Sequence, residues 1–189
     1  MTRFEKAADF AARFHAGQTR KLGGAPYIVH LYETAANAAM MTGSEDVLAA
    51  ALLHDTLEDT TLTADIIRAE FGETAARIVL WCSEDKMRGR DKTETWQERK
   101  VAAIERMKDA PLEAKIVLLA DKLSNIRAIA SAYAKDGDAV WAAFNNSDKL
   151  AQEWAYRSYA EALADLDDEF LYKEYVRLVD EVFGAGFDL

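Results

Sequence analysis

The chain has 189 residues, half of them apolar, and a formal net charge of −10 at pH 7, from 23 basic and 33 acidic side chains. This length and apolar share predict one folded domain with a sizeable core and exclude an intrinsically disordered protein. The acidity argues against general binding of DNA, RNA or anionic membranes, all of which require a broad basic surface. An anionic small molecule remains a compatible ligand if basic side chains are concentrated locally.

The start of the chain and its cysteine content indicate a cytoplasmic protein. Residues 1–17 carry scattered charges and lack the apolar centre of a signal peptide. No apolar run approaches the roughly 20 residues of a membrane-spanning helix. Cys82 is the single cysteine, so the chain cannot form an intrachain disulfide, which fits a reducing compartment.

In the first half of the chain, apolar spacing predicts amphipathic helices around one buried helix. The buried one is VLAAALLHDTLEDT, which is apolar on nearly all sides. Ser44 and Thr63 are expected to cap two of the helices, because their hydroxyls can accept from the free backbone N–H groups of a first turn. A glycine-containing loop with the adjacent cations Arg20 and Lys21 separates the first two helices. The expected helices cover residues 4–15, 27–41, 47–60, 63–71 and 73–82.

The second half opens with a polar, charged segment, residues 83–94, which is typical of a mobile loop. Four further helices follow, over residues 95–107, 112–133, 147–164 and 167–183. No segment alternates with period two for long enough to predict a strand, and the chain is rich in alanine. We therefore expect an all-α fold, a compact bundle of roughly seven to ten helices. It is expected to form one domain over residues 1–189, with a motif-bearing core at about 4–128 and C-terminal helices at 129–189.

His54 and Asp55 lie near the end of the buried third helix, where an unpaired charge costs several kcal/mol unless a partner or a metal compensates it. Glu58 and Asp59 follow four residues later. If the helix continues that far, Glu58 shares a face with His54, and Asp59 shares one with Asp55. A solvated helix end that carries acidic residues explains this pattern equally well when the segment is taken alone.

Two further segments supply polar side chains of the same kind. Asp121 follows a run of apolar residues, and Asn125 at i+4 points the same way. Taken alone, that pair and His30 are also compatible with ordinary pairing and packing. Together, His30, His54, Asp55 and Asp121 would offer two neutral nitrogens and two carboxylates, a set that suits Mn²⁺, Fe²⁺ or Zn²⁺. The absence of thiolate ligands argues against a structural zinc site.

Three segments resemble the signatures of HD-domain hydrolases of the RelA/SpoT type, in particular the small stand-alone alarmone hydrolases. They are HAGQTRKLGGAPYIVH at residues 15–30, AALLHDTLEDT at 50–60 and LADKLSNIR at 119–127. The resemblance extends over about residues 4–127. It implies an all-α fold and Mn²⁺-dependent removal of the 3′-pyrophosphate from guanosine tetra- and pentaphosphate (ppGpp and pppGpp), which yields GDP or GTP and pyrophosphate.

The resemblance also implies a role for each matching residue. The metal ligands would be His30, His54, Asp55 and Asp121. The residues that handle the attacking water and its proton would be Glu58 and Asp59. The residues that contact the nucleotide would be Arg20, Lys21 and Asn125, with the two cations packing against the base and meeting phosphate.

Candidates outside these motifs are less specific. Arg99 and Lys100 lie in a stretch that resembles the family's TDDK…ERK segment, and both are candidates for phosphate contacts. Arg88 and Arg90, in the preceding loop, fit a solvated surface better. Tyr156 resembles a nucleotide-contacting tyrosine of the family, and core packing explains it equally well.

The chain also departs from the family pattern. Leu31 stands where a proline is usual, and Leu118 stands where many relatives carry a lysine, whose loss would loosen phosphate contact or change the choice of substrate. An HD phosphatase acting on an adenosine alarmone (ppApp), a nucleoside monophosphate or NADPH is therefore an alternative. A non-catalytic nucleotide or metal sensor is another, although binding alone does not require the pair Glu58 and Asp59.

Overall fold

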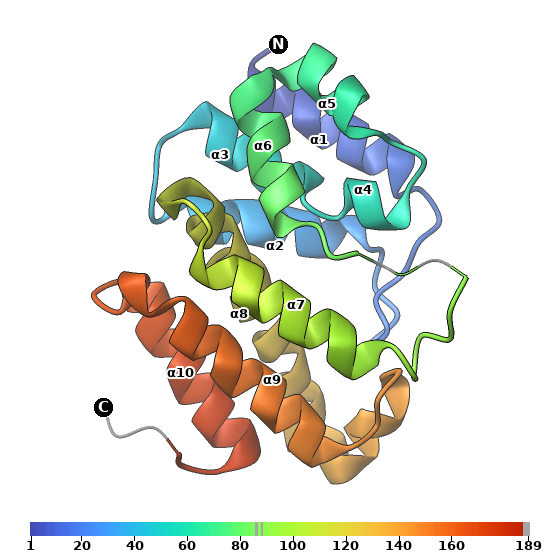
Figure 1. The fold of residues 1–189 in the computed structure, drawn as a ribbon, viewed down its shortest axis with the longest axis vertical. Helices are drawn as coiled ribbons and strands as arrows, with labels where there is room; N and C mark the ends of the chain where they lie inside the picture. The colour runs from blue at the N-terminus through green and yellow to red at the C-terminus, as the bar shows by residue number, and fades with distance from the viewer. Residues whose placement is uncertain (86, 88, 187–189) are drawn as a thin grey trace.

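The computed structural model describes residues 1–85, 87 and 89–186. Within these ranges the chain folds into α-helices and short 3₁₀ helices (η) without a strand, which confirms the all-α prediction (Figure 1). None of the described helices is long and apolar enough to cross a membrane. The elements are α1 (Arg3–Phe14), α2 (Ile28–Ala39), α3 (Glu45–Leu53), α4 (Thr56–Asp59), α5 (Ala64–Phe71), α6 (Glu73–Cys82), α7 (Trp96–Lys108), α8 (Leu112–Asp136), η1 (Gly137–Ala143), α9 (Lys149–Ala162), η2 (Ala164–Leu166) and α10 (Phe170–Phe183).

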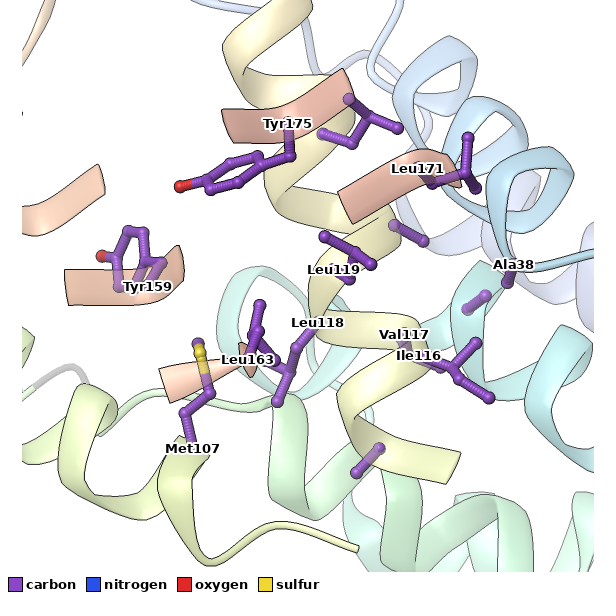
Figure 2. Packing of buried hydrophobic residues seen from close by; sticks show 14 of the residues in the cluster. Ala38, Met107, Ile116, Val117, Leu118, Leu119, Tyr159, Leu163, Leu171 and Tyr175 are labelled. Carbon is purple, nitrogen blue, oxygen red and sulfur yellow. The ribbon is translucent and has the colours of Figure 1, made fainter. Parts of the chain in front are cut away.

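The long helix α8 organises the core, as its apolar sequence predicts. It packs against α2, α3, α6 and α10, so that apolar side chains on most of its surface are buried. Figure 2 shows side chains from several helices in this core, including Ala38 of α2, Met107 of α7, Leu119 of α8, Tyr159 of α9 and Tyr175 of α10. Burial of such side chains is the main favourable contribution to folding.

The helices divide between two ends of the molecule (Figure 1). α1, α3, α5 and α6 gather at the end where the N-terminus lies, and α9 and α10 lie at the opposite end. α2 runs between these groups, and α8 contacts helices of both. Side chains on α2, at the α3–α4 junction and on α8 can therefore meet in the interior.

The expected continuous helix over residues 47–60 is wrong, because the chain breaks at His54 and Asp55. α3 ends at Leu53, whose carbonyl accepts a hydrogen bond from the Thr56 hydroxyl at 2.5 Å. α4 then starts a new turn, in which the Asp55 carbonyl accepts hydrogen bonds from the backbone N–H groups of Glu58 and Asp59. The interruption is confined to His54 and Asp55, because the Asp59 N–H still donates to the Asp55 carbonyl at 3.0 Å, one helical turn back.

Two expected helix starts in the C-terminal half are also misplaced. α9 begins at Lys149 rather than at residue 147, because the Asp148 carboxylate accepts from the Leu150 N–H at 2.9 Å and caps the helix there. α10 begins at Phe170 rather than at residue 167, since η2 and a turn occupy the preceding residues. The 3₁₀ helix η1, which begins at Gly137 directly after α8, was not predicted.

The two expected caps in the N-terminal half differ in outcome. The Thr63 hydroxyl accepts from the Ile66 N–H at 3.4 Å and caps α5 as predicted. α3 does begin directly after Ser44, but the Ser44 side chain makes no capping bond. Its backbone N–H donates instead to the Thr42 hydroxyl at 3.2 Å.

Candidate metal and nucleotide site

The four expected metal ligands meet in the interior, although they come from three separate segments. The ligand atoms of His30, His54 and Asp121 all lie within 4.8 Å of one another, and all three residues are buried. Asp55 Oδ2 lies 3.6 Å from His30 Nε2 and 3.0 Å from His54 Nε2. Asp121 Oδ1 lies 3.2 Å and 3.6 Å from the same two nitrogens. Two imidazoles thus face two carboxylates.

Hydrogen bonds on the far side of each ring fix which nitrogen carries the proton. The Ser124 hydroxyl donates to the Glu33 carboxylate at 2.8 Å, so it accepts from His30 Nδ1–H, which lies 2.8 Å away. His54 Nδ1 donates to the Ala51 carbonyl at 2.8 Å. When the imidazoles are neutral, as metal ligands must be, their Nε2 atoms therefore present lone pairs to the carboxylates, which is the orientation of histidine metal ligands.

The cluster requires a positive charge among these atoms. His54 Nε2 is buried and has no hydrogen-bond partner among the described residues, although Asp55 Oδ2 lies 3.0 Å away. Burial disfavours the charged imidazole, but Asp55 and Asp121 outweigh burial and raise the pKa of His54 well above its usual value. A divalent cation among the two nitrogens and two carboxylates supplies the same charge and uses the unpaired nitrogen. The residues present therefore fit a metal site.

Tyr27, which sequence reasoning missed, fixes one carboxylate of this cluster. Its hydroxyl donates to Asp55 Oδ2 at 2.6 Å. Burial and the negative charge of Asp55 raise the pKa of this hydroxyl far above its usual value, so it stays a donor. Tyr27 lies three residues before His30, and that spacing at the start of a helix is the signal that could have found it.

His15 and Gln18 connect the end of α1 to the same region. The His15 ring stacks on Tyr27 at 5.3 Å, and its Nδ1 lies 2.7 Å from Gln18 Oε1. The Gln18 amide donates in turn to the Asp59 carbonyl at 2.8 Å. These contacts hold the start of the basic loop, the loop that carries Arg20 and Lys21, against the short acidic helix α4. Neither His15 nor Gln18 is among the site residues that the sequence predicts.

The basic loop is closed by backbone hydrogen bonds and directs Arg20 toward the cluster. Arg20 N–H donates to the Ala25 carbonyl at 2.8 Å, and Tyr27 N–H donates to the Gln18 carbonyl at 2.9 Å. The turn between them uses positive φ at Gly23 and Gly24, a conformation that favours glycine.

From this loop, a short series of hydrogen bonds reaches a metal-ligand candidate. The Arg20 guanidinium donates to Asn125 Oδ1 at 2.8 Å, and the Asn125 amide donates to Asp121 Oδ1 at 2.6 Å. The Arg20 guanidinium also lies 5.9 Å from the centre of the Tyr27 ring. Lys21 is exposed and lines the cleft beside it.

Two chambers meet at the cluster. The outer chamber, about 1180 Å³, lies under the basic loop, and the inner chamber, about 280 Å³, lies among α6, α7, α8 and α9. Ligand-binding cavities commonly have volumes of about 300 to 1,000 Å³. The two chambers share lining residues at their junction, among them Lys21, Tyr27, Asp55, Glu58, Asn125 and Tyr156.

The two acidic residues of α4 are not equivalent. Glu58 lines both chambers, whereas Asp59 lines the outer chamber and is exposed. Glu58 Oε1 accepts from the Glu84 backbone N–H at 2.6 Å, which orients its carboxylate. Glu58 therefore lies at the junction, beside the metal-ligand candidates.

Arg99 and Lys100 reach the chambers but share an acidic partner. The Glu84 carboxylate accepts from the Arg99 guanidinium and, at 2.6 Å, from Lys100 Nζ. Burial alone would raise the pKa of Glu84, but Lys100 and Arg99 outweigh burial and hold it below its usual value. Arg90 lines the outer chamber and pairs with Glu98 at 2.9 Å.

The remaining sequence candidates divide as follows. Tyr156 is buried and lines both chambers, so its ring serves packing and faces the cleft at the same time. Arg88 lies outside the described residues. Leu31 is fully buried, and Leu118 lines the inner chamber.

Comparison with known proteins gives consistent matches. Residues 7–149 match the HD domain family. Over 125 residues the chain is 43% identical to the human guanosine-3′,5′-bis(diphosphate) 3′-pyrophosphohydrolase MESH1, a match that spans 65% of this chain and 66% of that protein. It is 32% identical over 186 residues to the bifunctional (p)ppGpp synthase/hydrolase SpoT of Escherichia coli, spanning 97% of this chain and 26% of SpoT.

Solved structures agree with the sequence matches. A metazoan ortholog of SpoT, described as hydrolyzing ppGpp and playing a role in starvation responses, superposes with a TM-score of 0.71 at 26% identity and covers 97% of this chain and 94% of that one. A protein from Listeria monocytogenes EGD-e superposes with a TM-score of 0.72 at 31% identity, covering 82% of this chain and 99% of the other.

Proposed function

The chain belongs to the HD domain family, and on that premise we propose that it hydrolyses the 3′-pyrophosphate of guanosine 3′,5′-bis-diphosphate. The products are a guanosine 5′-diphosphate and pyrophosphate, or the 5′-triphosphate when the substrate is pppGpp. The observation that carries the proposal is the convergence of two histidine Nε2 lone pairs and two carboxylates at the junction of two chambers. The names of the human and bacterial relatives supply the substrate class.

The charge of the cleft supports an anionic nucleotide. The whole chain has more acidic than basic residues, 33 against 23. The outer chamber reverses this balance, because its lining has five basic side chains and three acidic ones. The basic side chains are Arg20, Lys21, Arg90, Lys92 and Arg99. A local excess of cations in an acidic protein attracts anions to one place.

The metal is proposed as Mn²⁺, held by His30, His54, Asp55 and Asp121. A mixed nitrogen and carboxylate set suits a first-row divalent ion of intermediate hardness. When bound, such a metal lowers the pKa of a coordinated water and offsets phosphate charge.

The chain's own residues orient the nucleotide and transfer protons near the reacting phosphorus. Glu58, at the junction, is placed to take the proton of the attacking water. Asp59, which lines the outer chamber, is assigned to the proton transfer at the nucleotide's 3′-oxygen. Arg20 and Lys21 contact base and phosphate, and Asn125 orients both Arg20 and Asp121.

The reaction balances with one water. The water oxygen forms a bond to the phosphorus that carries the 3′-oxygen, and the bond between that phosphorus and the 3′-oxygen breaks. One water proton goes to Glu58, and the 3′-oxygen takes a proton to become a hydroxyl. The pyrophosphate keeps its own bridging bond.

A nucleotide panel tests the substrate. Metal-loaded protein is incubated with ppGpp, its adenosine counterpart ppApp, guanosine monophosphate and NADPH, and the products are separated by ion-exchange chromatography. Fastest release of pyrophosphate from ppGpp supports the proposal. A higher kcat/KM for another member of the panel identifies a different HD phosphatase, and binding without turnover identifies a sensor.

A further inference from the structure

The inner chamber has basic side chains that the mechanism above does not use. Lys100 and Arg106 enter it from α7, and Lys122 enters it from α8, next to the metal-ligand candidate Asp121. The chamber is smaller than the outer one, about 280 Å³ against about 1180 Å³, and the two are joined at the cluster.

Arg106 differs from the other two cations in having no acidic partner among the residues that the structure describes. Lys122 Nζ lies 2.6 Å from Asp121 Oδ2, and Lys100 Nζ lies 2.6 Å from a Glu84 oxygen. No hydrogen bond or ion pair links Arg106 to any residue that the structure describes, although it is half-buried in the chamber wall. A partly desolvated guanidinium without a partner is poised for an anion, because its planar set of donors matches phosphate oxygens.

We propose that the inner chamber binds the terminal phosphate of the 3′-pyrophosphate group, with Arg106 as its specific contact and Lys122 beside it. This inference rests on the proposed function and extends it. With the reacting phosphorus at the junction, the nucleoside occupies the outer chamber and the terminal phosphate occupies the inner one. The size of each chamber fits the part of the substrate assigned to it.

Polar and apolar neighbours complete the chamber wall around Lys122. Lys122 Nζ also lies 5.1 Å from the centre of the Tyr159 ring, which holds the ammonium against the chamber wall. Gln152 lines the same wall, and its amide donates to the Asn146 carbonyl at 2.7 Å. Trp96, Met107 and Leu118 add apolar surface to the wall.

The arrangement makes Arg106 a specificity determinant. A nucleotide with a 3′-pyrophosphate reaches both chambers, whereas a nucleotide with a 3′-monophosphate leaves Arg106 unpaired. Hydrolysis leaves pyrophosphate in contact with Arg106, so inorganic pyrophosphate should bind the same chamber and inhibit the enzyme competitively.

The test compares Arg106→Met with Arg77→Met. Methionine keeps most of the apolar stem and removes the charge. Arg77 is the matched control, because it lies exposed on α6 and lines neither chamber. Inorganic pyrophosphate is titrated calorimetrically into metal-loaded protein without nucleotide, and its inhibition constant is measured against ppGpp hydrolysis.

We expect Arg106→Met to weaken pyrophosphate binding about 10- to 100-fold, the usual effect of losing a charged hydrogen bond, and to raise the inhibition constant to match. Arg77→Met should leave both values unchanged, and Arg106→Lys should recover part of the loss. Unchanged binding in Arg106→Met, or no pyrophosphate binding by the wild type, overturns the inference while ppGpp hydrolysis stands. Pyrophosphate binding without any nucleotide hydrolysis instead overturns the proposed function.

Discussion

Arg20 and Asn125 lie 105 positions apart in the chain, and the Arg20 guanidinium donates to the Asn125 side-chain oxygen at 2.8 Å. Asn125 donates in turn to Asp121, so the basic loop and the metal-ligand candidates are linked through one side chain. A nucleotide phosphate that enters the cleft can replace Asn125 as the partner of Arg20. The free site thus keeps its arginine oriented toward the substrate.

Removal of Arg20 should therefore affect the substrate more than the fold. We expect Arg20→Ala to lower kcat/KM for ppGpp about 10- to 150-fold, because a charged hydrogen bond contributes roughly 1.5 to 3 kcal/mol. Arg20→Lys should restore little, since lysine cannot stack as a plane. The melting temperature and metal content are measured alongside. Wild-type kinetics in Arg20→Ala would show that the loop only connects two helices.

Tyr27→Phe tests the hydrogen bond that orients Asp55. The substitution removes one hydroxyl and keeps the ring that stacks on His15. Loss of a group that orients a metal ligand typically weakens metal binding 10- to 100-fold, so we expect a rise of about that size in the metal dissociation constant. Tyr32→Phe, which alters an exposed tyrosine on the same helix, is the control. An unchanged metal affinity in Tyr27→Phe would mean that Asp55 needs no such support.

Glu58→Gln and Asp59→Asn separate proton transfer from metal binding. Both keep the shape of the side chain and remove its basicity. We expect each to lower kcat by about 10²-fold or more, the usual contribution of a general acid or base. Metal content, measured by elemental analysis, should stay near that of the wild type. Loss of metal from either variant would place that carboxylate among the ligands.

Chelation should destabilise the protein, because the four proposed ligands join three separate segments of the chain. Metal at about 100 times its dissociation constant contributes roughly 2.7 kcal/mol to stability. For a chain of this length that corresponds to a melting temperature higher by about 5 to 10 °C. Mn²⁺ added back should restore both the melting temperature and hydrolysis. A melting curve unaffected by exhaustive removal of metal would contradict the site.

The ion pairs of Glu84 with Arg99 and Lys100 should make the stability of the protein depend on pH in the acidic range. Lys100 and Arg99 hold the pKa of Glu84 in the folded state below its ordinary value of 4.5. The resulting stabilisation is complete above that value and is lost as the pH falls through the folded-state pKa. Urea unfolding at pH 7 and near pH 3.5 should show a smaller loss in Glu84→Gln than in the wild type. Equal losses in both proteins would show that Glu84 does not contribute, and Glu105→Gln, on the exposed face of α7, serves as control.

The sequence predicted most of the helices and singled out the four residues that the fold brings together, because apolar spacing and short motifs are local features. It did not predict the break at His54 and Asp55, which depends on the Thr56 hydroxyl reaching the Leu53 carbonyl. The contact of Tyr27 with Asp55 was also missed, because it joins segments whose proximity only the fold creates.

The inner chamber was missed for the same reason. Arg106 looks like any surface arginine of an amphipathic helix, and only the packing of α7 beside α6 and α9 places it in a chamber wall. The sequence pattern that predicts phosphate contacts for Arg99 and Lys100 also gives no sign of Glu84. Its carboxylate accepts hydrogen bonds from both cations only because the fold brings the three residues together.

Product stoichiometry gives the most direct test of the proposed reaction. Metal-loaded wild type and Asp121→Asn are incubated with ppGpp, and GDP, pyrophosphate and single phosphate are quantified over time. We predict that the wild type releases GDP and pyrophosphate in equal amounts, with no single phosphate, and that Asp121→Asn releases neither product at a measurable rate. Release of single phosphate, or equal rates in the two proteins, would contradict a 3′-pyrophosphohydrolase that acts at this site.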